Sequence, residues 1–234
     1  MLNLRAQAGW LGHVFKAATQ QHHVYLREPF TRYIPKDAVV FDIGAHAGQF
    51  SKLFARMAPE GQVYAFEPSA YARSVLEPTL AFNRIRNVEI VPMGLSDADG
   101  ELTLATPIKK RGGMGFGLAH LGADTSGRPV MNQTVKLTTL DGFAQSRGLK
   151  RLDFIKADVE GWEAHILRGG METLAAFKPV LFFEVVAESL ARAETTPAEI
   201  WERLSGLGYK SFKSPSFEPI AEYGPHGDYL FVAD

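Results

Sequence analysis

One stretch of sequence decides the fold: Val39-Val40-Phe41-Asp42-Ile43-Gly44-Ala45-His46-Ala47-Gly48, followed after a gap by Val63-Tyr64-Ala65-Phe66-Glu67-Pro68. Each part is an apolar run of strand length that ends in an acidic residue, and the first continues through a glycine turn into a helical pattern. A strand, a glycine turn, a helix and a second strand form the nucleotide-binding unit of parallel α/β proteins. The stretch therefore predicts a nucleotide-type pocket.

The spacing of the glycines indicates which nucleotide is bound. Pyrophosphate-binding turns read G-x-G-x-x-G, whereas this turn reads D-x-G-x-x-x-G from Asp42 to Gly48, which favours a ligand without phosphates. S-adenosylmethionine is such a ligand. Glu67 would accept hydrogen bonds from its ribose, Gly44 would allow close approach to its methionine half, and Asp42 would hold its ammonium, directly or through water. The helix that begins near Gly48 offers N–H groups to its carboxylate.

Composition bounds the class of protein. The 234 residues are 46% hydrophobic, enough to bury the core of a single domain. Lys and Arg number 25 against 26 for Asp and Glu, so we expect neither a nucleic-acid nor a membrane partner. The chain has no cysteine, which excludes disulfides and thiolate chemistry. Because neither a signal-peptide pattern nor a membrane-spanning run is evident, we expect a cytoplasmic protein.

Strand and helix patterns alternate along the chain, which predicts an α/β fold with parallel pairing and right-handed crossovers. We expect seven principal strands, at 39–43, 62–66, 88–91, 152–157, 180–183, 209–212 and 229–232. Helices are expected over 48–58, 70–83, 140–147, around 166–174 and from 196 to 204. Thr196 and Pro197 begin the last of these as N-cap and first helical residue.

We expect two further parts outside this alternation. Residues 1–35 form a helical extension to a domain over 36–234. Its amphipathic helix should pack on the core through the apolar residues Leu4, Ala8, Leu11, Phe15 and Ala18, with Trp10 and Val14 beside them. His22 and His23 follow in a polar turn and are interpreted as solvated. Residues 107–133 form a glycine-rich loop, which is either a lid over the acceptor site or a tolerated surface insertion.

Acidic residues stand at the carboxyl ends of four of the expected strands: Asp42, Glu67, Asp158 and Glu184. Ligands bind at this edge of an α/β sheet, so the four should line one crevice. Methyl transfer to a hydroxyl requires alignment and removal of one proton, for which Asp158 or Glu160 is the candidate base and His165 a weaker one. Asp158 and Glu184 are also candidate ligands of a divalent cation such as Mg²⁺.

A structural interpretation of these residues stays open. Glu160 or Asp158 would then cap a helix, Glu163 would lie in a first helical turn, and Lys156 would pair with a neighbouring carboxylate.

Several motifs together resemble the FkbM family of S-adenosylmethionine-dependent methyltransferases. They are residues 39–48 with Phe50-Ser51, Phe66-Glu67-Pro68, Gly94-Leu95-Ser96-Asp97, Pro179 to Glu184 and, most specifically, Lys156-Ala157-Asp158-Val159-Glu160-Gly161-Trp162-Glu163. The resemblance implies a single-domain Rossmann-like three-layer sandwich whose seven-stranded sheet is mostly parallel, with the last strand antiparallel. It implies a cofactor site at Asp42, Gly44, Ala45, His46, Gly48, Phe50, Glu67, Pro68, Leu95, Ser96 and Asp158, and a catalytic group of Asp158, Glu160 and Glu184.

The resemblance also implies O-methylation of a small-molecule hydroxyl, on a sugar, polyketide or other secondary metabolite. Three alternatives remain: an N-methyltransferase acting on a small molecule or peptide, a cofactor-binding module without catalysis, and a nicotinamide-dependent oxidoreductase. The last should carry the glycine triplet that this chain lacks. A homodimer is compatible with the sequence.

Overall fold

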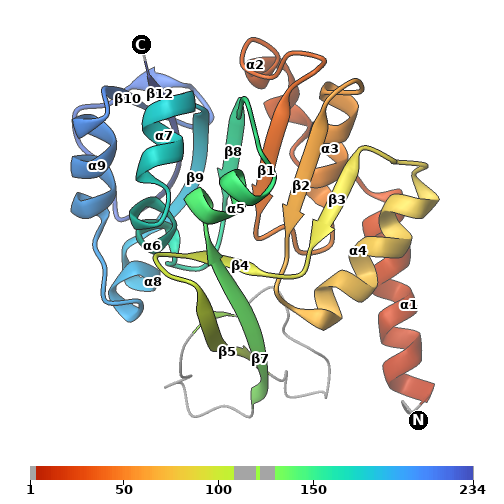
Figure 1. Cartoon of the computed structure of the whole chain (residues 1–234). Helices are drawn as coiled ribbons and strands as arrows, with labels where there is room; N and C mark the ends of the chain where they lie inside the picture. Colours follow the sequence, from red (N-terminus) through yellow and green to blue (C-terminus); the bar gives the residue numbers. More distant parts are fainter. Residues whose placement is uncertain (1–3, 108–119, 122–129, 234) are drawn as a thin grey trace.

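A computed structural model describes residues 4–107, 120–121 and 130–233 and shows a Rossmann-like α/β sandwich (Figure 1). Within these residues the main sheet has the order β11-β10-β12-β9-β8-β1-β2-β3. Its strands are β1 (Val39–Ile43), β2 (Gln62–Phe66), β3 (Val88–Val91), β8 (Phe154–Ala157), β9 (Val180–Val186), β10 (Tyr209–Lys213), β11 (Glu218–Pro219) and β12 (His226–Ala233).

The predicted fold class is confirmed. β1, β2, β3, β8 and β9 pair in parallel, and β12 is antiparallel to both of its neighbours. The described sheet has eight strands instead of seven because the two-residue strand β11 adds to its edge. Strand β9 extends through Glu184, which therefore lies inside a strand and not at its end.

Helices cover both faces of the main sheet because successive strand residues point to opposite sides. Val40 packs among residues of α2 (Arg27–Phe30) and α3 (Gln49–Met57), whereas Phe41 packs among those of α5 (Leu140–Ser146), α6 (Glu163–Arg168), α7 (Met171–Phe177) and α9 (Pro197–Gly206). Helix α4 (Ala70–Phe82) covers Ala65 on the α3 side. The remaining helices are α1 (Leu4–Thr19), the 3-10 turn η1 (Val24–Leu26) and α8 (Ala187–Arg192).

The structure corrects one local expectation about helices and confirms another. The helix expected around 166–174 is divided into α6 and α7 at Gly169-Gly170, and a Cβ atom on Gly169 would lie 2.1 Å from the Ser96 carbonyl oxygen. Thr196 caps α9 as expected, since its hydroxyl accepts a hydrogen bond from Glu199 N–H.

A second sheet flanks the main one below its strand ends (Figure 1), with the order β4-β7-β5-β6. Its strands are β4 (Gly94–Ser96), β5 (Gly100–Pro107), β6 (His120–Leu121) and β7 (Val130–Thr139). The Gln133 side chain connects β7 to the segment after β2. Its amide oxygen accepts a hydrogen bond from Ala70 N–H, and its amide nitrogen donates one to the Pro68 carbonyl. Most of the glycine-rich segment, for which a lid and a surface insertion were the two alternatives, lies outside the described residues.

The N-terminal helix packs on the domain with only part of the predicted face, namely Trp10, Val14 and Ala18. Trp10 donates a hydrogen bond to Ser74 and His13 bonds Tyr71, both on α4, while Leu11 and Phe15 are 59% and 71% exposed. Trp10 and His13 each have a ring that packs and a nitrogen that forms a hydrogen bond. A pattern based only on apolar residues does not predict contacts of this mixed kind. In the described residues, no helix has the length and apolar character needed to cross a membrane.

The buried Lys52 of α3 fastens the end of α1. Its ammonium donates to the carbonyls of Ala17 and Gln20 at 2.5 and 2.7 Å, and burial lowers its pKa to about 8, so it stays charged at pH 7. We expect Lys52→Met to lower the free energy of unfolding by about 2 kcal/mol, because two carbonyls lose charged donors. Urea unfolding measures this, with exposed Lys150→Met as the control, and equal stability of the two variants would contradict it.

Candidate functional site

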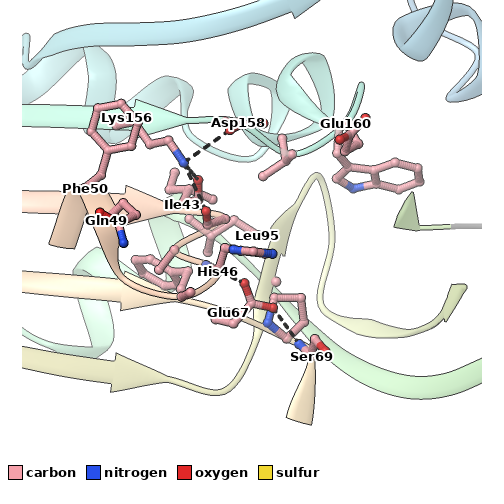
Figure 2. Close-up of a pocket in the computed structure, with 18 of the residues that line it drawn as sticks. Ile43, His46, Gln49, Phe50, Glu67, Ser69, Leu95, Lys156, Asp158 and Glu160 are labelled. Atoms are coloured by element: carbon pink, nitrogen blue, oxygen red, sulfur yellow. Dashed lines mark hydrogen bonds and ion pairs between the residues drawn. The ribbon is translucent and has the colours of Figure 1, made fainter. Parts of the chain in front are cut away.

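A cavity of about 320 Å³ opens at the carboxyl ends of β1, β2 and β8 (Figure 2). This is the edge of the sheet where parallel α/β proteins bind ligands. Three segments form most of its wall: the glycine turn after β1, the turn after β2 and the loop after β8. Its lining residues include His23, Gly44, Ala45, His46, Gln49, Phe50, Glu67, Pro68, Ser69, Leu95, Leu104, Lys156, Asp158, Glu160 and Trp162.

Glu67 is fixed at one end of the cavity by backbone donors. One carboxylate oxygen accepts a hydrogen bond from His46 N–H at 2.7 Å and the other from Ser69 N–H at 2.8 Å (Figure 2). Burial raises the pKa of Glu67 to about 6, against the opposing effect of those two donors. A carboxylate has about four lone-pair sites, so Glu67 keeps acceptor capacity for a ligand.

The glycine turn comes very close to the loop after β8. Gly44 has a φ of +73°, and a Cβ atom there would lie 2.1 Å from the carbonyl oxygen of Asp158. Only glycine combines this backbone conformation with this approach. Position 44 therefore determines how near the two walls of the cavity lie.

The Lys156 side chain binds the backbone of the same turn. Its ammonium donates to the carbonyls of Ile43 and Gly44 at 3.2 and 3.0 Å, and it lies 3.6 Å from Asp42 and 3.8 Å from Asp158. Figure 2 shows this side chain between Phe50 and Asp158. An ammonium so placed bonds the turn's carbonyls and offsets the charge of two acids.

Asp42 lies beneath the cavity and is not among the residues that line it. It is fully buried, and Ser51 donates a hydrogen bond of 2.5 Å to it. Burial raises the pKa of Asp42, while the charge of Lys156 and the Ser51 hydroxyl act in the opposite direction. The structure therefore gives Asp42 protein partners in place of the direct ligand contact considered above.

The loop after β8 is shaped by Glu163. Its carboxylate accepts hydrogen bonds from Val159 N–H at 3.2 Å and Gly161 N–H at 3.5 Å, and burial raises its pKa to about 7. Gly161 has a φ of +105°, and a Cβ atom there would lie 2.2 Å from the Ser189 carbonyl oxygen. Glu163 therefore has the structural role considered above, and it holds Asp158 and Glu160 on the cavity side.

A second, smaller cavity of about 90 Å³ adjoins the first. It is lined by His23, Phe50, Lys156, Ala157, Asp158, Phe182, Glu184 and Asp228. Burial and the negative charge of neighbouring Asp158 raise the pKa of Glu184 to about 8. Asp158, Lys156, Phe50 and His23 border both cavities. Among the described residues, no group of three or more acids and histidines is arranged to hold a metal ion, so the Mg²⁺ hypothesis gains no support.

Comparison with known proteins assigns the family. The profile of the methyltransferase FkbM domain matches residues 42–211. The chain belongs to the FkbM methyltransferase family. The match includes the glycine turn, Glu67 and the loop after β8.

Relatives of this FkbM-family chain differ in size. It is 26% identical over 205 residues to 2-O-methyltransferase NoeI of Sinorhizobium fredii, which covers 83% of this chain and 79% of NoeI. It is 32% identical over 182 residues to the AMB antimetabolite synthetase AmbE of Pseudomonas aeruginosa, covering 62% of this chain and only 8% of AmbE. A methyltransferase-like protein of Streptococcus mutans, SMU.1697c, solved with SAH, shares the fold with a TM-score of 0.52 at 11% identity, over 88% of this chain and 94% of that one.

The larger cavity of the FkbM-family chain brings together most of the predicted site residues: Gly44, Ala45, His46, Phe50, Glu67, Pro68, Leu95, Asp158 and Glu160. Glu184 lines the smaller cavity. Two others support the site from outside: Gly48 begins α3 with a φ of +84°, and Ser96 accepts a hydrogen bond from Trp162.

Sequence reasoning missed two residues that line both cavities. Lys156 was interpreted only as a pairing partner, although a lysine inside an apolar strand is a signal, because a buried ammonium requires acceptors. His23 was interpreted as solvated, and this interpretation is wrong: the side chain is half-buried and stacks on Phe50 with ring centroids 4.4 Å apart. Its sequence neighbourhood carries no signal for that contact.

Proposed function

We propose that this FkbM-family chain transfers the methyl group of S-adenosylmethionine to a hydroxyl of a sugar or another small secondary metabolite. The observation that carries the proposal is Glu67, whose two oxygens are fixed by backbone donors at one end of the larger cavity. A carboxylate held in this way suits the two adjacent hydroxyls of a ribose. No comparable cradle for a pyrophosphate accompanies it in the described turn, which has glycine at positions 44 and 48 only.

The comparisons support this proposal. A family of methyltransferases matches the segment that builds the cavity, the relative NoeI is a 2-O-methyltransferase, and a structural neighbour was solved with SAH. S-adenosylmethionine is the methyl donor whose product is SAH. A hydroxyl acceptor follows from NoeI by analogy and is the finer part of the proposal.

The two adjoining cavities suit donor and acceptor. With the ribose at Glu67, the methionine half lies toward Gly44 and Asp158, and the reacting methyl lies toward the smaller cavity. The acceptor oxygen attacks the methyl carbon in line with the departing sulfur, the carbon–sulfur bond breaks, and its electron pair stays on sulfur. The acceptor loses one proton. Because the sulfonium already activates the methyl, alignment is the main task of the protein.

The donor part of the proposal is tested by calorimetry with SAH. We expect binding at micromolar concentrations to the full chain, and no binding of NADH under the same conditions. Binding of NADH in place of SAH would favour the oxidoreductase alternative. The acceptor part is tested by incubating the protein with S-adenosylmethionine labelled in its methyl group and an extract of the host, and then identifying the labelled product. A label on nitrogen would assign the N-methyltransferase alternative.

Asp158 borders both cavities, and we propose that it orients the acceptor molecule beside the methyl group. Asp158→Asn is expected to lower the labelling rate by about 100-fold, because the amide replaces a charged acceptor oxygen with a donor at the junction of the two cavities. The affinity for SAH should change by less than about fivefold. Glu188→Gln on α8 is the control, since it lies on neither cavity. Full labelling by Asp158→Asn would exclude this role.

A further inference from the structure

His23 reaches the junction of the two cavities from a part of the chain remote from the family motifs. It belongs to neither the glycine turn nor the loop after β8, yet it lines both cavities together with Phe50, Lys156 and Asp158. Its φ of 60° is in the left-handed region, which is uncommon for residues other than glycine. A backbone conformation of this kind persists only where the surrounding contacts hold it.

Contacts from α3 and from Asn83, the C-cap of α4, hold the segment that carries His23. Lys52 binds the carbonyls of Ala17 and Gln20, and Asn83 donates to the Ala18 carbonyl at 3.0 Å. Gln49, which itself lines the larger cavity, accepts a hydrogen bond from His22 N–H at 3.1 Å. Helix α3 directly follows the glycine turn, so the turn and His23 are fixed to the same helix.

The imidazole of His23 has a stacked ring on one side and ionisable groups around it. It lies on Phe50 with an interplanar angle of 18°, and within the described residues neither of its nitrogens makes a hydrogen bond. The charges that act on it are those of His22 on its own segment, Asp42 at β1, and Lys156 and Asp158 at β8. Glu184 of β9 and Asp228 of β12 line the smaller cavity beside it.

We propose that His23 accepts the proton of the acceptor hydroxyl during methyl transfer, an inference that rests on the proposed function. As the oxygen–methyl bond forms and the carbon–sulfur bond breaks, the O–H proton passes to an imidazole nitrogen. The products are the methyl ether, neutral SAH and an imidazolium, which returns its proton to water after product release.

Its surroundings suit His23 to this role better than they suit the neighbouring acids. Burial, His22 and Lys156 lower the pKa of His23 from 6.5, against the smaller opposing effects of Asp158 and Asp42, so the ring is neutral at pH 7. A neutral imidazole has a nitrogen lone pair and an affinity for protons near the working pH, which general-base catalysis favours. The negative charge of Asp158 already acts on Glu184, and the Lys156 ammonium lies 3.8 Å from Asp158.

The first test needs no acceptor. Sinefungin carries an ammonium where S-adenosylmethionine carries its methyl sulfonium, whereas SAH carries neither. Because sinefungin and SAH share the ribose, the ratio of their two affinities cancels effects of pH at the ribose. As the pH falls from 7.5 through the lowered pKa of His23, protonation of His23 should weaken sinefungin relative to SAH by about fivefold more in the wild type than in His23→Gln. Glu188→Gln, at an exposed position on neither cavity, should keep the wild-type trend. Equal trends in the wild type and His23→Gln would overturn the proposal.

The second test uses labelled donor and the extract fraction that the wild type methylates. His23→Gln should lower kcat by about 100-fold and lose the fall in rate at low pH, while KM for the donor changes by less than about threefold. A merely structural role would change KM or stability and leave the pH profile in place. Wild-type rates in His23→Gln would overturn the proposal, whereas a wild type that fails to bind SAH would overturn the proposed function and this inference with it.

Discussion

Gly44→Ala is expected to weaken SAH binding by at least about 100-fold, on the order of 3 kcal/mol. The new Cβ atom would lie 2.1 Å from the Asp158 carbonyl oxygen, at a φ of +73° that alanine rarely adopts. The glycine turn and the loop after β8 must move apart to remove this clash between the Cβ atom and the carbonyl oxygen. Both line the larger cavity, so the donor would lose its fit on two sides at once. Calorimetry with SAH measures the loss.

A second glycine separates backbone strain from the clash. Gly148 has a φ of +59°, and a Cβ atom added there would meet no other atom within 4 Å, so Gly148→Ala carries the strain without the contact. We expect this variant to be destabilised by about 1 kcal/mol and to bind SAH as the wild type does. If Gly44→Ala also bound SAH normally, the close approach of these two walls would not define the donor site.

The sequence was most informative where chemistry and secondary structure share a short segment. β1, β2 and β3 begin and end as predicted, because each is an apolar run bounded by turn residues. Glu67 lies on the cavity as predicted, since the residue after a parallel strand meets the ligand edge of the sheet. The same rule predicted Asp42 wrongly. Asp42 is one residue before the end of β1, and it lies beneath the cavity and does not line it.

Residues that act across long sequence separations could not be placed in this way. His23 stacks on Phe50 because Lys52 binds the backbone at the end of α1 and Gln49 binds the backbone of His22. No local sequence pattern predicts those contacts. The prediction for α1 fails at Leu11 and Phe15 for a related reason: Trp10 and His13 bind polar partners on α4, and the face that these bonds select leaves both side chains exposed. Tertiary hydrogen bonds decided both outcomes.

Glu67→Gln is expected to weaken SAH binding by about 30-fold at pH 7.5, equivalent to about 2 kcal/mol. The wild-type carboxylate accepts hydrogen bonds from His46 N–H and Ser69 N–H and, in the proposed complex, from the ribose. A glutamine keeps one acceptor oxygen and turns an N–H₂ group toward a backbone N–H. The variant therefore loses a ribose contact and also disturbs the turn that positions the contact.

The pH dependence of the same interaction provides an independent test. Burial raises the pKa of Glu67 to about 6, so its carboxylate form, which accepts the ribose hydrogen bonds, is present above pH 6 and lost below it. Wild-type SAH affinity should accordingly be about tenfold lower at pH 5 than at pH 7.5. Glu67→Gln has no such group and should lose most of that dependence, whereas Glu77→Gln, at an exposed position of α4, should keep it. An unchanged pH profile in Glu67→Gln would show that another group governs donor binding, because SAH itself does not titrate in this range.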